Sequence, residues 1–246
     1  MPLLASTPAP AVVARTAYSI YPRAASYFAF VLLVTIAGFF PSYFARLGHA
    51  SPVYHFHGLT ALSWMLLLIT QAHLANTRRL NLHRRLGRFS MVLMPAFVIS
   101  GFLVINVMLE ARNPFNQTFG ARLAWIDITT LIYFAAAYVL ALIHRRNQPL
   151  HARWLASTAV VVLPPGLARF VGNCIPGIAS FEMAIYVTYA ICGLATLGLL
   201  WDDTKKGGIR APYVALAVTL AAHVIGFVLV PEWSWWNELT RSFAVK

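Results

Sequence analysis

Histidines near the ends of apolar stretches are the residues in this sequence whose chemistry is most informative. His83 belongs to NLHRRLGRFS (81–90) and His151 to LHARWLAS (150–157), so Leu-His-x-Arg occurs twice, each time just before an apolar run. His73 and His144 lie near the ends of the preceding apolar runs. Imidazole ligates haem iron and metal ions. Four imidazoles at a similar depth predict a b-type haem or a related redox site. The alternative is that they are interfacial residues that help cap helix ends.

A second polar set is expected toward the other side of the same helices. His57, Trp64 and Gln71 are spaced by seven residues, so they share one helix face and span ~21 Å along the axis. Ionisable groups at membrane depth usually face the bundle interior, where they are paired or functional. We therefore expect a ligand cavity on the outer side, lined by His57, Gln71, Asp127, Arg169, Glu182 and His223. Alternatively, Asp127 and Arg169 form a structural ion pair, Glu182 lies in headgroup water and His223 is a core histidine.

Several other chemistries lack their sequence signatures. No HxxxH or ExxH spacing occurs in the apolar runs, and the two cysteines have no CxxC spacing, so we predict no metal site. The three lysines lie outside these runs, which excludes a retinal Schiff base, and neither GxxxxGK[ST] nor GxSxG occurs. A pair of haems is disfavoured because Gln71, four turns from His57, is not a usual ligand. A single haem remains, between His73 or His83 on one helix pair and His144 or His151 on the other.

The composition predicts the elements that must position these residues. Of the 246 residues, 59% are hydrophobic and only 11% are charged, well under half the charged share of a soluble domain. Apolar stretches of about 20 residues are long enough to cross a bilayer as helices. We predict an all-α, polytopic transmembrane bundle in the bacterial inner membrane. Its seven expected spans cover 24–47, 54–76, 89–109, 123–143, 154–171, 179–201 and 212–230, with a kink at Pro41 and a break or kink at Pro164-Pro165.

The distribution of basic residues predicts the orientation and the ends of the chain. Thirteen of the nineteen lysines and arginines fall on the side of the N-terminus, which favours a cytoplasmic N-terminus and a C-terminus outside. Residues 1–23 are expected to form a flexible cytoplasmic tail and residues 24–230 the bundle. Residues 231–246, with Trp233, Trp235 and Trp236 beside charges, are expected to form an amphipathic tail at the outer interface.

The net charge of +12 points to a lipid partner and not to nucleic acid. Arginines clustered at cytoplasmic helix ends orient a membrane protein and bind anionic headgroups, which needs no further chemistry.

Two functions compete with the redox hypothesis. One is a cofactor-free binding or transport protein, because the broken fifth span can free backbone carbonyls to line a cavity. The other is an accessory subunit of a larger membrane complex.

Residues 54–169 resemble a group of uncharacterised, predicted bacterial membrane proteins that carry LHRxLGR and HRRWM-like motifs. The first motif is matched by His83, Arg84, Leu86, Gly87 and Arg88, the second by His151, Arg153 and Trp154, and a later arginine by Arg169. Leu155 replaces the methionine and Thr158 stands near an expected arginine, and the first and last spans match nothing in the group. The resemblance implies a membrane protein and little about its activity. A four-helix core with histidines on each helix is also similar in architecture to ascorbate-reducible cytochrome b and ferric-reductase-like domains, without their paired-ligand spacing.

Overall fold

The computed structural model describes residues 21–111 and 113–243, and within these ranges it contains helices and turns but no strand. The helices are α1 (Ala24–Phe39), α2 (Pro52–Asn76), α3 (Leu80–Glu110), α4 (Pro114–Ile143), α5 (Gln148–Val161), α6 (Pro164–Cys174), α7 (Phe181–Lys205), α8 (Ala211–Leu229) and α9 (Ser234–Phe243), with 3₁₀ turns η1 (Phe44–His49) and η2 (Val230–Glu232). Most of the expected N-terminal tail, including Arg15, lies outside the described residues, as do Arg112 and Lys246.

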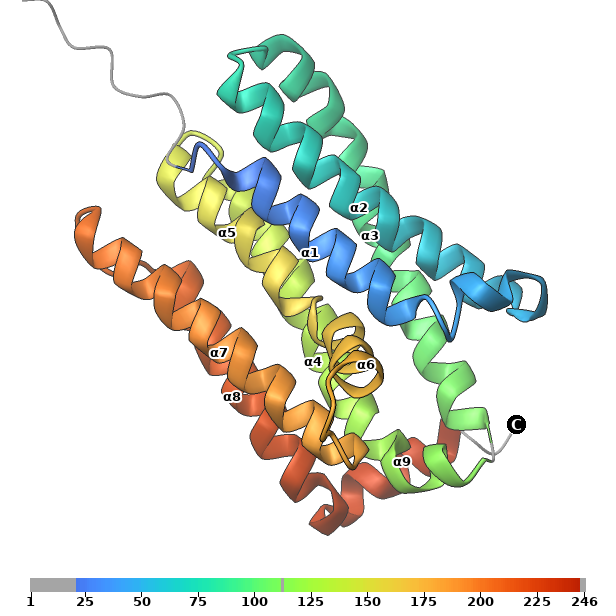
Figure 1. The fold of residues 1–246 in the computed structure, drawn as a ribbon. Helices are drawn as coiled ribbons and strands as arrows, with labels where there is room; N and C mark the ends of the chain where they lie inside the picture. Colours follow the sequence, from blue (N-terminus) through green and yellow to red (C-terminus); the bar gives the residue numbers. More distant parts are fainter. Residues whose placement is uncertain (1–20, 112, 244–246) are drawn as a thin grey trace, which may run out of the picture.

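The architecture is that of a membrane-embedded helical bundle (Figure 1). Five helices (α2, α3, α4, α7 and α8) are long and apolar enough to cross a membrane, and α5 with α6 makes a sixth candidate whose halves are bent by 41°. The bend falls at Pro164-Pro165, as the sequence predicts, because neither proline can donate a helical hydrogen bond. Large apolar side chains such as Val92 and Leu194 point outward and are more than two-thirds exposed, which suits contact with lipid.

The helices turn at two ends that differ in charge. One end, here called the basic end, holds the start of α1, the α2–α3 turn, the α4–α5 loop and the α7–α8 loop. Most of the arginines and lysines lie there. The opposite end holds η1, the α3–α4 turn, the α6–α7 loop and α9 (Figure 1).

Both Leu-His-x-Arg segments lie inside helices, whereas the sequence predicts that each helix starts at or after the end of its motif. α3 begins at Leu80 and not at residue 89, and α5 begins at Gln148 and not at residue 154. Arginine is a good helix former, so a basic segment outside the hydrocarbon layer can extend a transmembrane helix by several turns. The two motif histidines therefore lie on the first turns of α3 and α5.

The first expected span is shorter than predicted. α1 ends at Phe39, two residues before Pro41, whose nitrogen cannot donate a helical hydrogen bond, and the chain continues through η1. α1 crosses α6 closely at Gly38 and Gly166, where a Cβ on Gly38 would overlap the Gly166 carbonyl. Small residues that let two backbones approach are typical of contacts between membrane helices.

The C-terminal segment, expected to form an amphipathic tail, packs against the helices of the bundle. It forms α9, which lies across the opposite end of the bundle near α3 and α4 (Figure 1). Trp236 is buried, its indole N–H donates to the Ala121 carbonyl at 2.9 Å, and its ring packs edge-on against Trp125. Trp236 therefore anchors α9 to α4 at this end of the bundle.

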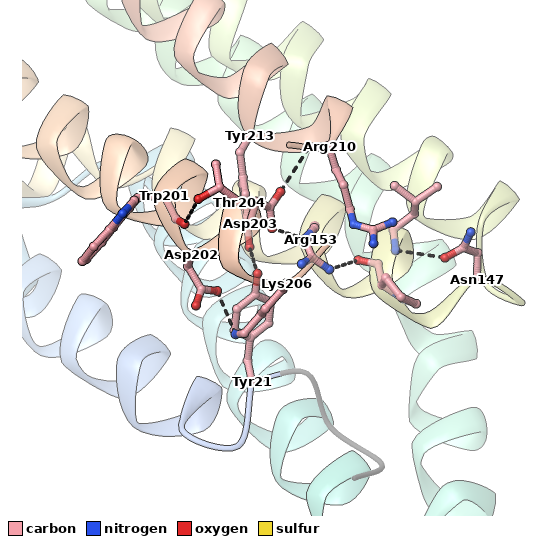
Figure 2. A network of polar contacts seen from close by, with 12 residues as sticks. Tyr21, Asn147, Arg153, Trp201, Asp202, Asp203, Thr204, Lys206, Arg210 and Tyr213 are labelled. Carbon is pink, nitrogen blue, oxygen red and sulfur yellow. Dashed lines mark hydrogen bonds and ion pairs between the residues drawn. The ribbon is translucent and has the colours of Figure 1, made fainter. Parts of the chain in front are cut away.

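A buried ion pair ties α5 to α7 at the basic end (Figure 2). Arg153 Nε lies 2.6 Å from Asp203 Oδ1, and both side chains are almost fully buried, at 1% and 0% exposure. Arg153 Nη1 also donates to the Pro149 carbonyl at 3.1 Å, and Asp203 Oδ2 accepts from the backbone N–H of Arg210 at 3.2 Å. The pair thus joins α5, α7 and the start of α8.

Tyr21 covers this ion pair from the N-terminal side (Figure 2). Its ring lies 5.5 Å from the Arg153 guanidinium carbon and 4.3 Å from Lys206 Nζ, and both are cation–π contacts. Its hydroxyl accepts from the Tyr213 hydroxyl at 3.1 Å. Burial raises the pKa of the Tyr21 phenol, so the group stays neutral at physiological pH.

We expect the Asp203→Asn variant to lose about 3–5 kcal/mol of folding stability, because it leaves the Arg153 charge buried without a counter-ion. The measurement is thermal or denaturant unfolding of the purified protein in detergent. Asp202→Asn is the matched control, since the Asp202–Lys206 pair is more than a third exposed and should contribute less than ~1 kcal/mol. Equal losses in the two variants would contradict the structural role of the buried pair.

A second stability prediction concerns Gly226, where α8 meets Trp125 of α4. The Trp125 indole donates to the Ala222 carbonyl at 3.0 Å, and a Cβ on Gly226 would overlap the indole ring. Gly226→Ala is therefore expected to cost about 1–3 kcal/mol through overpacking. Gly198→Ala in α7 has open space around its Cβ and should leave the unfolding midpoint unchanged or raise it. The same unfolding assay tests both, and a harmless Gly226→Ala would count against the close packing of α4 and α8.

Candidate functional site

The first candidate site begins at the α2–α3 hairpin, where Gln71 and His83 bind each other. His83 Nδ1 lies 3.3 Å from the Gln71 carbonyl, and the Gln71 side-chain amide donates to the His83 carbonyl at 3.0 Å. Gly87 lies one turn further along α3, and a Cβ there would approach Gln71 Nε2 to 3.3 Å. Gln71, expected in the outer cavity, therefore lies at the basic end with the LHRRLGR motif.

The second motif histidine makes the same connection in the α4–α5 hairpin. His151 Nδ1 lies 2.8 Å from the carbonyl of Ala141, near the end of the preceding helix. A carbonyl can only accept, so Nδ1 carries the proton in both His83 and His151, and the neutral ring keeps its lone pair on Nε2. Each histidine thus links the first turns of one helix to the last turns of the helix before it.

His83 and His151 also lie close enough to interact electrostatically, although they belong to different hairpins. The other two inner histidines are placed differently. His73 is exposed on α2, and His144 Nδ1 donates to the Leu140 carbonyl of its own helix at 2.8 Å. Among the described residues, no hydrogen bond or ring contact joins either of them to the pair. His83 and His151 are therefore the two of the four expected ligands that the structure relates to each other.

The expected outer cavity residues divide into separate groups. His57 of α2 faces α3, where Nδ1 lies 3.0 Å from Ser100 Oγ and Thr60 completes a small hydroxyl cluster. Glu182 lies in the first turn of α7 and is partly exposed. The remaining three, Asp127, Arg169 and His223, are described next.

Asp127 of α4 lies within electrostatic range of Arg169 of α6, but no ion pair within 4.0 Å joins the two side chains among the described residues. The Tyr189 hydroxyl lies 3.1 Å from His223 Nδ1 of α8. Tyr189 and His223 therefore form a hydrogen-bonded pair between α7 and α8.

Arg169 also lines a pocket between α6 and the start of α7, here called the α6–α7 pocket. The pocket has a volume of about 370 Å³ and is lined by Phe115, Ala168, Arg169, Gly172, Asn173, Ile178, Ala179, Ser180, Phe181 and Ala184. The guanidinium of Arg169 stacks on Phe39 at 4.5 Å and donates to the Pro165 carbonyl at 2.9 Å. The pocket offers a cation and an amide beside aromatic and small apolar surfaces.

Two functional candidates were not singled out from the sequence. Asp203 is the partner of Arg153, and its only signal was that Asp202 and Asp203 are the sole acidic residues at the basic end. Tyr189 lies in the apolar run of α7, where nothing local distinguishes it from a packing residue. Both became visible only when helices distant in sequence were brought together.

The described residues contain no group of three or more His, Cys, Asp or Glu side chains able to hold a metal ion. Two imidazoles with free Nε2 atoms are a different donor set, which suits axial ligation of haem iron. A carbonyl bound to Nδ1 is the usual outer partner of a ligating histidine, because it fixes the tautomer and the ring orientation.

Comparison of the chain with protein-family models, with curated proteins and with solved structures finds no match.

Proposed function

We propose that this integral membrane protein binds one b-type haem between His83 and His151 and serves in electron transfer. One observation carries the proposal. The two repeats of Leu-His-x-Arg each fix a histidine at the basic end by an Nδ1–H bond to a carbonyl of the preceding helix. Both Nε2 atoms are then available as ligands, in the tautomer that iron requires.

The residues around the pair support this donor set. A bound b-type haem supplies one-electron chemistry, and its potential depends on its axial ligands and on the polarity of its surroundings. Gln71 holds the backbone of His83, and the Arg153–Asp203 pair holds the α5 turn that follows His151. These contacts keep both rings on rigid helix starts, as a ligand pair requires.

The proposal includes a specific topology. α1 would be a seventh crossing, since this mostly apolar helix of 16 residues lies beside α2 and α6. The excess of arginine and lysine at the basic end favours a cytoplasmic location for that end and a C-terminus outside. We propose the inner membrane of a bacterium as the location, with the haem near its cytoplasmic face.

A cofactor-free binding or transport protein is the second candidate. The observation that favours it is the broken α5–α6 span beside the α6–α7 pocket, because interrupted helices commonly border substrate sites in transporters. In this case Asp127→Asn should alter ligand affinity or flux while the protein still folds.

The haem proposal predicts that His83→Asn and His151→Asn each abolish haem binding. Asparagine can replace the Nδ1–H donor toward the Gln71 or Ala141 carbonyl but cannot ligate iron, so the fold should persist. The measurement is the absorption spectrum of protein purified from haem-supplied cells, before and after dithionite. Wild type should show an intense Soret band that shifts on reduction.

His73→Ala and His144→Ala are the matched controls, and both should retain the full Soret band. Unfolding midpoints of all four variants separate loss of a ligand from loss of the fold. Full haem content in both asparagine variants would refute the assignment, and a wild-type spectrum of protein absorption alone would favour the cofactor-free candidate.

We further propose that the arginines of the α3 start bind anionic lipid headgroups. Arg84, Arg85 and Arg88 line an open depression with Asn81, and exposed Phe89 and Val92 follow them on α3. Replacing all three arginines by glutamine should weaken phosphatidylglycerol binding about fivefold per arginine, since a basic residue near an anionic surface contributes ~1 kcal/mol. Native mass spectrometry with defined lipids measures this. Arg241→Gln, at the opposite end, is the control, and an unchanged affinity in the triple variant would contradict the site.

A further inference from the structure

The α6–α7 pocket has no role in the proposed haem site. It lies at the opposite end of the bundle, where α6 contacts α7 (Figure 1), whereas His83 and His151 lie at the basic end. Its volume of about 370 Å³ falls in the lower part of the range that is usual for small-molecule sites. The side chains that line the pocket decide which chemistry it accepts.

Arg169 gives the pocket a positive charge that no ion pair neutralises. No acidic side chain of the described residues, Asp127 included, lies within 4.0 Å of its guanidinium nitrogens. A charged side chain among apolar membrane helices is costly, and it is usually paired or functional. An anionic ligand in the pocket would supply the missing partner.

The Arg169 guanidinium is oriented by two contacts and still has donors to offer. It stacks on the Phe39 ring of α1 at 4.5 Å, and Nη1 donates to the Pro165 carbonyl at 2.9 Å. The planar fork carries further N–H groups beyond that bond. Because the side chain is exposed and lines the pocket, a ligand can reach these donors. A fork held in a fixed orientation matches the two oxygens of a carboxylate.

The start of α7 adds backbone donors at the same pocket. This helix of 25 residues has Ser180 as its N-cap, and Ser180 Oγ accepts from the Met183 N–H at 3.1 Å. The preceding N–H groups, of Phe181 and Glu182, have no acceptor within the helix, and the positive end of the helix dipole lies there. Ser180 and Phe181 line the pocket, whereas Glu182, whose carboxylate would repel an anion, is not part of the lining.

Most of the remaining lining is apolar. Phe115 and Phe181 meet edge-on with their ring centroids 4.9 Å apart. Small residues complete the walls, namely Ala168, Gly172, Ala179 and Ala184. Aromatic rings and small side chains together suit a flat apolar group. The pocket thus combines one cationic side with apolar walls.

We propose that the α6–α7 pocket binds a small carboxylate that carries an aromatic or other apolar group. The carboxylate accepts hydrogen bonds from Arg169 and from the first N–H groups of α7, and the apolar group packs against Phe115 and Phe181. The inference does not depend on haem. It supplies a ligand class for the cofactor-free candidate function, on whose pocket it rests.

Binding of phenylacetate to the full-length protein in phosphatidylcholine nanodiscs, measured by isothermal titration calorimetry, tests the proposal. Phenylacetamide has nearly the same shape without the charge, and we expect it to bind about tenfold more weakly, because charge-assisted hydrogen bonds are lost. Arg169→Gln should weaken phenylacetate binding by a similar factor for the same reason. Arg46→Gln is the matched control, since it removes a positive charge from η1 at the same end and outside the pocket lining, and it should keep the wild-type affinity.

Gly172→Leu tests the pocket without changing a charge. A Cβ on Gly172 lies 3.7 Å from the Ala184 Cβ, so a leucine side chain there occupies space between α6 and α7 and should weaken phenylacetate binding several-fold. This variant keeps the test decisive if the unfolding midpoint shows that Arg169→Gln does not fold.

Three results would overturn the proposal: no binding of phenylacetate to the wild-type protein, equal binding of phenylacetamide, or wild-type affinity in both Arg169→Gln and Gly172→Leu. Displacement of phenylacetate by phosphatidylglycerol added to the nanodiscs would also overturn it, because the pocket would then take a lipid phosphate. None of these measurements depends on haem content, and flux in Asp127→Asn tests the transport function separately. Failure of the ligand class is therefore distinguishable from failure of either proposed function.

Discussion

The buried pair of Arg153 and Asp203 is the interaction on which the basic end of the bundle depends. It joins α5 to α7 across 50 residues of sequence and also holds the start of α8 and the ring of Tyr21. Removing either partner leaves a buried charge, so the pair enforces one arrangement of these helices more than it adds net stability. His151 lies two residues before Arg153 on the same helix, and its side chain is held by the Ala141 carbonyl.

The histidine of each Leu-His-x-Arg segment makes one hydrogen bond that both stabilises a helix pair and selects its tautomer. In each hairpin the histidine bonds through Nδ1 to a carbonyl of the preceding helix, which stabilises the turn. The same bond selects the tautomer in which Nε2 is unprotonated. The bond to the carbonyl leaves Nε2 with its lone pair, so the capping and ligand interpretations of the motif are compatible.

Two polar regions occupy different parts of an apolar bundle. His83 and His151 lie at the basic end, and the α6–α7 pocket with Arg169 lies at the opposite end. Between α2, α3 and α4 lies a dry aromatic core that includes Trp64, Phe97 and Phe134. Aromatic side chains packed at ring separations near 4.5 Å leave no room for water, so this core separates the two polar regions of the bundle.

The sequence by itself determined the helical, membrane-embedded class, the break at Pro164-Pro165 and the two ends of unequal charge. These follow from local causes, namely the length of each apolar run, the missing N–H of proline and the position of arginines. Tertiary structure alone decided that Trp236 packs on α4 and that Gln71 contacts His83 and not His57. It also brought Arg153 to Asp203 and Tyr189 to His223. Such contacts depend on which faces of distant helices meet, and an apolar span buries its backbone equally well in any rotation about its own axis.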